Sequence, residues 1–176
     1  MRATFVCLTM MLISSASLAQ VRSSQPTPEG GRLAAVLLFI QEGLNKTGKM
    51  DFQVVVNDRT LHVVSETSGV SASVDRCGIQ YHSSYSVNGN VLNNKSSYIS
   101  FRDIQTLTVL TAEQDFQQIN PTFDGKVRPQ VFFLRVQEKG TDIHRSPEFV
   151  FPDGPTAESI KRAMIQATTL CTRVIQ

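Results

Sequence analysis

The sequence contains no Trp, only three Cys among 176 residues, and almost no net charge, with 17 Lys and Arg against 15 Asp and Glu. Three cysteines are too few for a disulfide-rich scaffold. The near-neutral charge provides neither the basic surface typical of nucleic-acid binding nor an acidic tail. Ten Gly and seven Pro exclude collagen-like and broadly disordered classes. The length is typical of one domain that buries its own core.

Long apolar runs are also missing, but the N-terminus carries a short one. Apolar residues are concentrated between Phe5 and Ile13, after Arg2, and small residues follow up to Ala19. This order predicts a secretory signal peptide over residues 1–19, cleaved between Ala19 and Gln20. The alternative is a membrane anchor, which the pattern disfavours because the run is about half of the ~20 residues needed to span a bilayer. We expect a secreted or periplasmic protein with no transmembrane segment in its mature chain.

Cleavage changes the cysteine count. It removes 19 of the 176 residues and leaves 157, and Arg2 and Cys7 are lost with the signal peptide. The mature chain keeps Cys77 and Cys171. In an oxidising compartment this pair suggests one disulfide, which would close a loop of about 95 residues and stabilise the fold by on the order of 4 kcal/mol. Two free buried thiols are the alternative.

A flexible polar leader over 20–27 precedes a predicted helix over 28–46. Thr27, Pro28 and Glu29 form a helix-start signal, with a cap, a proline in the first turn and an acid near the positive end of the helix dipole. Gly48 follows as a stop signal. The apolar stripe at helical spacing consists of Leu33, Val36, Leu37, Ile40 and Leu44.

From residue 51 to residue 151 the apolar period changes to two, which predicts about seven short strands. Asn57-Asp58 and Asn88-Gly89 are turn signals. A change of phase at Asp75-Arg76 indicates a bulge or a break between two strands. The polar segment 112–128 is predicted to be the longest loop. The expected strands include 52–56, 60–65, 70–74, 77–81, 98–101, 104–110, 131–136 and 143–151.

A second amphipathic helix is predicted over 156–175, and we expect it to dock on an open end or face of the sheet. Ala163 and Ala167 make the middle of its apolar face small, so another element can approach closely. The predicted class is α+β: an antiparallel β-barrel or sandwich with an N-terminal helix and a closing C-terminal helix. The apolar face consists of Ile160, Ala163, Met164, Ala167, Leu170, Cys171 and Val174.

This order of strands, long loop and closing helix resembles a pleckstrin-homology-like (PH-like) barrel of uncharacterised secreted bacterial proteins. The run Ile99–Ile104, the Cys77-Gly78-Ile79 strand start and the Leu170-Cys171 pair carry the resemblance. It implies seven antiparallel strands in two near-orthogonal sheets, with the helix plugging one end. The N-terminal helix is an addition to that plan. The Lys/Arg cluster of phosphoinositide-binding PH domains is not recognisable in the first strands.

The sequence lacks the common catalytic and nucleotide-binding motifs, and no cofactor or catalytic residue is predicted. A metal site would have to use His62, His82, Cys77 and Asp75, whose spacing matches no ligand pattern, so surface positions are favoured for the histidines. Cys77 as a nucleophile would need His82 as its base, but an odd separation places the two on opposite faces of a strand.

Two acid pairs invite comparison with hydrolases: Glu113 with Asp115, and Glu148 with Asp153. We interpret both pairs as solvated charges in or beside loops. The favoured function is an exported, non-catalytic binding or scaffold module for an unknown protein, peptide or lipid, acting through a sheet edge or the groove beside the C-terminal helix. The alternative is a small secreted hydrolase-like enzyme that uses His62 or His82 with an acid.

Overall fold

The structure is a computed structural model that describes residues 28–173. The predicted signal peptide, the cleavage site at Ala19 and Gln20, and the leader over 20–27 lie outside these residues, as do the last two residues of the helix predicted over 156–175. The described elements are, in chain order, α1 (Pro28–Thr47), β1 (Lys49–Val56), β2 (Arg59–Ser73), β3 (Gly78–Val87), β4 (Asn90–Ser100), β5 (Ile104–Thr111), α2 (Ala112–Ile119), β6 (Lys126–Arg128), β7 (Phe132–Glu138), the 3-10 turn η1 (Ile143–Arg145), β8 (Glu148–Phe151) and α3 (Gly154–Arg173).

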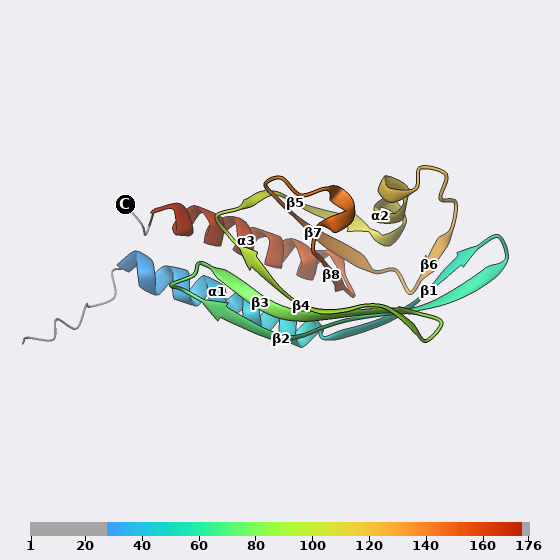
Figure 1. Cartoon of the computed structure of the whole chain (residues 1–176), viewed down its shortest axis with the longest axis horizontal. Helices are drawn as coiled ribbons and strands as arrows, with labels where there is room; N and C mark the ends of the chain where they lie inside the picture. The colour runs from blue at the N-terminus through green and yellow to red at the C-terminus, as the bar shows by residue number, and fades with distance from the viewer. Residues whose placement is uncertain (1–27, 174–176) are drawn as a thin grey trace, which may run out of the picture.

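The strands form two antiparallel sheets, one with the order β4-β3-β2-β1-β6 and one with the order β5-β7-β8. The class is therefore α+β, as predicted. The two sheets form a sandwich-like arrangement and do not close into a barrel. Figure 1 shows the larger sheet below the smaller one, with α1 and α3 packed against each other at one end and the β1–β2 hairpin extending at the other.

Two tight turns connect the long strands of the larger sheet. Asn57 and Asp58 join β1 to β2 with φ values of 48° and 58°, and Asn88 and Gly89 join β3 to β4 with φ values of 50° and 79°. Two successive positive φ values match the twist of the flanking strands in a two-residue hairpin. Both predicted turns are confirmed.

β2 differs from the sequence prediction. Residues 60–65 and 70–73, expected in separate strands over 60–65 and 70–74, belong to one strand that continues through a register shift between Ser68 and Ser71. Gly69 lies in this shift with a φ of 59°, a conformation that glycine adopts without strain. The phase change at Asp75-Arg76 is confirmed as a break, because β2 ends at Ser73 and β3 begins at Gly78.

The prediction of one long loop over 112–128 was wrong. This segment contains α2 and β6. Thr111 and Gln114 form a capping box at the start of α2, in which each side chain accepts a hydrogen bond from the other residue's backbone N–H. β6 pairs with β1 at the edge of the larger sheet. The strand predicted over 143–151 is also shorter: η1 occupies its first residues and only β8 is extended.

The two long helices pack against each other. Gly43 on α1 allows the close approach of α3, because a Cβ there would collide with Ile160. Asn45 joins α1 to β2 through two hydrogen bonds with the backbone of Val70. The buried residues of α1 are Leu33, Leu37, Ile40 and Leu44, and those of α3 are Ala157, Ile160, Ala163, Met164, Ala167, Leu170 and Cys171.

Candidate functional site

The hydrophobic core is divided into two clusters, and polar residues separate them along the inner face of the larger sheet. One cluster includes Ile79 and Tyr81 beside α1 and α3, and the other includes Val63 and Phe52, with Val87 packed against it. Alternate residues of a strand share a face. The inner face of β3 therefore runs from apolar residues through Ser83 to apolar residues again.

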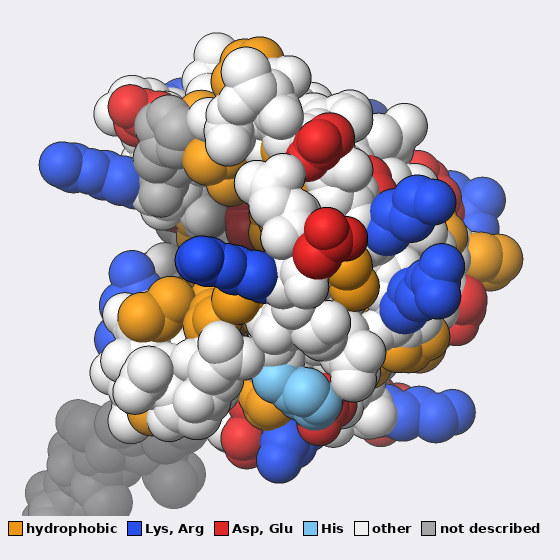
Figure 2. Space-filling view, turned by 90° about the vertical axis from the view of Figure 1, so that its right-hand side faces the viewer, with side chains coloured by type: hydrophobic (Ala, Val, Ile, Leu, Met, Phe, Trp, Pro, Cys, Tyr) orange, Lys and Arg blue, Asp and Glu red, His pale blue; other side chains and the backbone are white. Residues whose placement is uncertain are grey.

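The neighbouring strands repeat this interruption. Ser83 is paired with Thr67 on β2 and with Lys95 on β4, and the adjacent Tyr85 is paired with Ser65 and Asn93. Small or polar side chains thus occupy one face of three strands at the same level. Because these side chains do not fill the space between the sheets, a cavity of about 480 Å³ remains there. Its volume is within the range of small-molecule sites. Figure 2, which views the molecule from the right-hand side of Figure 1, shows a hollow in the surface.

The opposite wall of the cavity is built by α2, β7 and β8. Asp115 and Phe116 come from α2, Phe133 from β7, and Glu148 and Val150 from β8. Glu148 is paired across the strands with Arg135, which explains why a charged residue of the buried strand β7 has a partner there.

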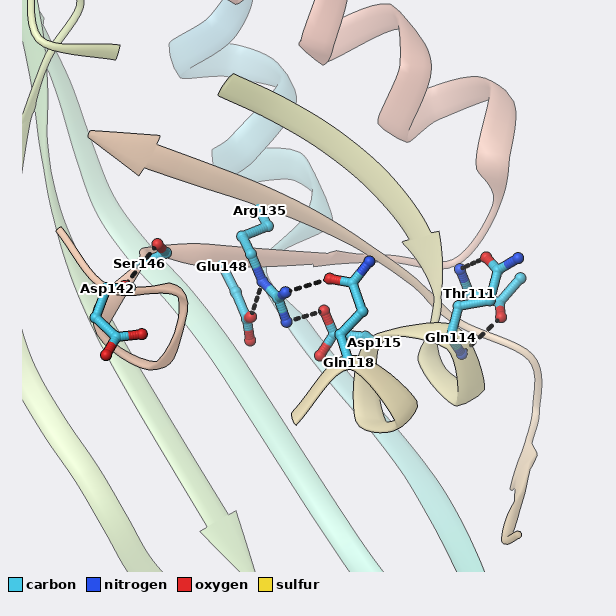
Figure 3. A network of polar contacts seen from close by, with 8 residues as sticks. All are labelled: Thr111, Gln114, Asp115, Gln118, Arg135, Asp142, Ser146 and Glu148. Atoms are coloured by element: carbon cyan, nitrogen blue, oxygen red, sulfur yellow. Dashed lines mark hydrogen bonds and ion pairs between the residues drawn. The ribbon is translucent and has the colours of Figure 1, made fainter. Parts of the chain in front are cut away.

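Arg135 organises this wall through three hydrogen bonds (Figure 3). Its Nη2 donates to Oδ1 of Asp115 at 2.5 Å, its Nε to Oε1 of Glu148 at 2.7 Å, and its Nη1 to Oε1 of Gln118 at 2.6 Å. The Arg135 side chain is 4% exposed, that of Asp115 is 1% exposed and that of Glu148 is 26% exposed. A buried guanidinium therefore links α2 to β7 and β8.

Burial perturbs the acids of this cluster. The pKa of Asp115 is raised to about 7 by desolvation and by the charge of Glu148, against the opposing effect of Arg135. Burial also raises the pKa of Glu148, against the effect of the Arg135 hydrogen bond. The pKa of Tyr85 is raised by burial and by the charges of Glu148 and Asp115. Perturbed groups that converge on one cavity are typical of functional sites.

One atom of the cluster lacks a partner. Oδ2 of Asp115 is buried and accepts no hydrogen bond from any residue in the described range 28–173. A buried carboxylate oxygen without a donor is unfavourable by about 1–3 kcal/mol or more. Asp115 is also among the residues that line the cavity.

The two acid pairs that invited comparison with hydrolases do not form catalytic pairs in the structure, and their members have different surroundings. Asp115 was expected to be solvated and is buried, because α2 folds over β7 and presents it to Arg135. Glu113 instead accepts from Val127 N–H and Gln130; although burial acts to raise the pKa of Glu113, these hydrogen bonds lower it. Asp153 caps α3 by accepting from Thr156 N–H at 2.7 Å. The structure brings together one member of each pair, Asp115 and Glu148.

The residues considered as metal ligands or enzyme bases lie elsewhere. His62 is beside Asp51 at 3.2 Å, with both side chains more than half exposed, and His82 is 3.4 Å from Ser96. Neither histidine is among the residues that line the cavity. Within the part of the chain that the structure describes, no group of three or more His, Cys, Asp or Glu side chains is placed to hold a metal ion.

Cys77 and Cys171, which the sequence left open as a disulfide or two free thiols, are joined by a disulfide with a Cα–Cα distance of 5.9 Å. The bond links the turn before β3 to the last turns of α3. Cys77 has a φ of 53°, and its carbonyl accepts from Phe101 N–H at 2.9 Å. These contacts give Cys77 a structural role at the end of the sheet distant from the cavity's acid cluster.

The groove predicted beside the C-terminal helix corresponds to a depression between α1 and α3. It has a volume of about 340 Å³ and is lined by residues that include Val36, Phe39, Arg162 and Ala163. Phe39 is 49% exposed there. The other predicted location, a sheet edge, corresponds to β4 or β6 in the larger sheet and to β5 or β8 in the smaller one.

Comparisons with protein-family models, with curated proteins and with solved structures gave no match to this chain. The resemblance to PH-like barrels therefore stays a prediction. Among the described helices, none is long and apolar enough to span a bilayer.

The sequence contains one signal for this site. Arg135 interrupts the otherwise apolar run Phe132-Phe133-Leu134-Arg135-Val136. A charge in a buried strand requires a partner. That requirement points to acids elsewhere in the chain, although it does not say which.

Proposed function

We propose that this chain is an exported, non-catalytic binding module and that the cavity between its two sheets holds the ligand. One observation carries the binding site: Ser65, Ser83 and their neighbours interrupt the inner face of the sheet between two hydrophobic clusters. Apolar side chains at these positions would have extended a single core and stabilised the fold. A cavity lined by serines, tyrosines and acids is instead suited to a small polar or amphipathic ligand.

Export is supported by the signal-peptide pattern over 1–19 and by the Cys77–Cys171 disulfide, since disulfides persist in oxidising compartments. The test is to express the full chain and determine the N-terminus of the accumulated protein by mass spectrometry. Export predicts a chain that begins at Gln20 and is recovered outside the cytoplasm. An intact N-terminus in the cytoplasmic fraction would contradict it.

The binding site is tested by filling it. Ser83→Leu places an apolar side chain on the cavity floor, and Ser96→Leu is the matched control, because Ser96 is exposed and does not line the cavity. A panel of small fragments of mixed charge is screened by NMR against the mature chain. At least one fragment should shift amides of β3 and α2 in the wild type and in Ser96→Leu, but not in Ser83→Leu. If no fragment of any charge binds there, the proposal is wrong.

A hydrolase is the second candidate, favoured by the two carboxyl groups of raised pKa at one cavity, Asp115 and Glu148. Both are engaged by Arg135, which leaves less freedom for proton transfer than an acid–base pair requires. Assays with chromogenic glycosides and esters decide between the candidates. Turnover by the wild type that is lost in Glu148→Gln and retained in Ser96→Leu would favour the enzyme.

A further inference from the structure

The acid cluster of the cavity carries more negative than positive charge. Arg135 supplies one cation, whereas Asp115 and Glu148 supply two carboxylates. The third acceptor of Arg135 is Gln118, which is neutral. When both acids are ionised, the cluster has a net charge of −1, and the charge of Glu148 contributes to the raised pKa of Asp115.

One oxygen of the acid cluster has no hydrogen-bond partner in the described part of the chain. Oδ1 of Asp115 is used by Arg135, and Oδ2 is buried without a partner in the described part of the chain. A ligand that donates a hydrogen bond to Oδ2 satisfies an unmade bond. If the donor is charged, it also neutralises the cluster, and charge-assisted bonds are about twice as strong as neutral ones.

The walls next to Asp115 are aromatic. Phe116 follows it on α2, and the rings of Phe116 and Phe133 are 5.8 Å apart at an angle of 62°. Tyr85 comes from the facing sheet, and the charges of Glu148 and Asp115 contribute to its raised pKa. Aromatic faces attract cations and cover apolar groups at the same time.

The cations that line the cavity do not cancel the attraction of the acid cluster for a positively charged ligand. Lys95 and Arg145 are exposed, so solvent screens their charges. Asp115 is almost fully buried, and its charge is screened far less. Two further acids, Glu66 and Glu138, also line the cavity.

We propose that the cavity binds a small organic cation, an ammonium or guanidinium group on an apolar body, with the charged group at Oδ2 of Asp115 and the body between Tyr85 and Phe116. This inference rests on the proposed function and specifies the ligand class of the same cavity.

The test uses three probes of similar shape: phenethylammonium, neutral 2-phenylethanol and anionic 3-phenylpropionate. They are titrated into the oxidised mature chain at about pH 8, where an acid of pKa about 7 is ionised, and amide shifts are followed by NMR. We expect the cation to shift amides of β3 and α2 and to bind about ten-fold or more tightly than the alcohol. The carboxylate should bind more weakly still.

Two acid variants locate the charge. Asp115→Asn should weaken phenethylammonium binding by about ten-fold or more, whereas Glu113→Gln, on the same helix but outside the cavity lining, should not change it. If Asp115→Asn does not fold, Glu148→Gln serves as the second variant, because it also removes negative charge beside the site. Equal affinities for the cation in Asp115→Asn or Glu148→Gln and in the wild type would overturn the inference.

A pH series on the unmodified protein needs no variant. The groups that face Asp115 are Arg135 on β7, Glu148 on β8 and Tyr85 on β3. Between about pH 8 and about pH 6 Asp115 gains a proton, so cation affinity should fall while alcohol affinity stays constant. A cation affinity that does not change over this range contradicts the inference.

The outcomes separate the two proposals. Equal or tighter binding of the alcohol or the carboxylate in the cavity overturns the cation assignment and leaves the binding function intact. If all three probes fail while a neutral or anionic fragment from the mixed panel binds at β3 and α2, the cation assignment is again overturned and the binding function stays intact. Failure of every fragment overturns both.

Discussion

The guanidinium of Arg135 lies 2.5 Å from the carboxylate of Asp115, and neither side chain is more than 4% exposed. This pair joins β7 to α2, a helix of only eight residues. A helix of that length is not stable alone. Its position therefore depends on the ion pair and on the packing of Phe116 against Phe133. The same contact places Asp115 in the wall of the cavity.

Replacement of Arg135 by Met should be strongly destabilising at neutral pH. It leaves Asp115 and Glu148 buried without their cation, which typically lowers the free energy of unfolding by about 3–5 kcal/mol. Denaturant unfolding measures the loss. At about pH 5 both acids, whose pKa values are raised, are more fully protonated, so the loss should be smaller there. An equal loss at the two pH values would argue against uncompensated charge as the cause.

The pH dependence of stability provides a second prediction. Burial raises the pKa of Asp115 from 3.8 to about 7, so the native state keeps a proton that the unfolded chain releases at lower pH. The contribution of Asp115 to stability is therefore present below about pH 4 and is lost as the pH rises to about 7, with a slope of up to about 1.4 kcal/mol per pH unit. Glu148 acts in the same direction, because its pKa is also raised.

Asp115→Asn removes the titrating group and should flatten the stability profile between about pH 4 and about pH 7. The matched variant Glu113→Gln should keep the wild-type slope in this range, because the pKa of Glu113 is lowered and its own contribution is lost only at more acidic pH. Thermal or urea unfolding at several pH values measures both slopes. A wild-type profile that rises across this range would contradict the assignment of a buried, protonated Asp115.

Gly78→Ala should destabilise the fold through close packing between β3 and β4. A Cβ at Gly78 would collide with the Tyr98 hydroxyl and with the backbone carbonyl of Ile99, and the backbone carbonyl has little freedom to move. Overpacking of this kind typically costs about 1–3 kcal/mol. Gly31→Ala is the control: no atom lies within 4 Å of its Cβ position, and alanine favours a helix. Denaturant midpoints should fall for Gly78→Ala and stay equal or rise for Gly31→Ala.

Local patterns in the sequence were sufficient to predict the β3–β4 hairpin and the buried face of α1. Asn88 and Gly89 both adopt the positive φ that a two-residue hairpin turn requires. This dipeptide alone identifies the hairpin that joins β3 to β4. The stripe from Leu33 to Leu44 likewise identifies the buried face of α1, because helical spacing depends only on neighbours in the chain.

The site depends on contacts that no local pattern contains. Asp115 and Arg135 are 20 residues apart, and the polar interruption of the core is visible only when Ser83 is paired with Thr67 and Lys95. α2 spans about two turns, too few for a periodic pattern, and its one local signal was the capping box of Thr111 and Gln114. From the sequence alone, its polar composition therefore predicts a loop and a solvated Asp115.

The disulfide should contribute a large part of the stability of the mature chain. Cys77 and Cys171 are separated by 94 residues, and both are 1% exposed. Closure of a loop of this length restricts the unfolded chain and corresponds to about 4 kcal/mol.

Alkylation followed by mass spectrometry should find no reactive thiol in the unreduced mature protein and two after reduction under denaturing conditions. The double variant Cys77→Ala/Cys171→Ala should unfold at a lower denaturant concentration than the oxidised wild type, and reduced wild type should resemble the variant. Two alkylated thiols without reductant would show that the bond does not form.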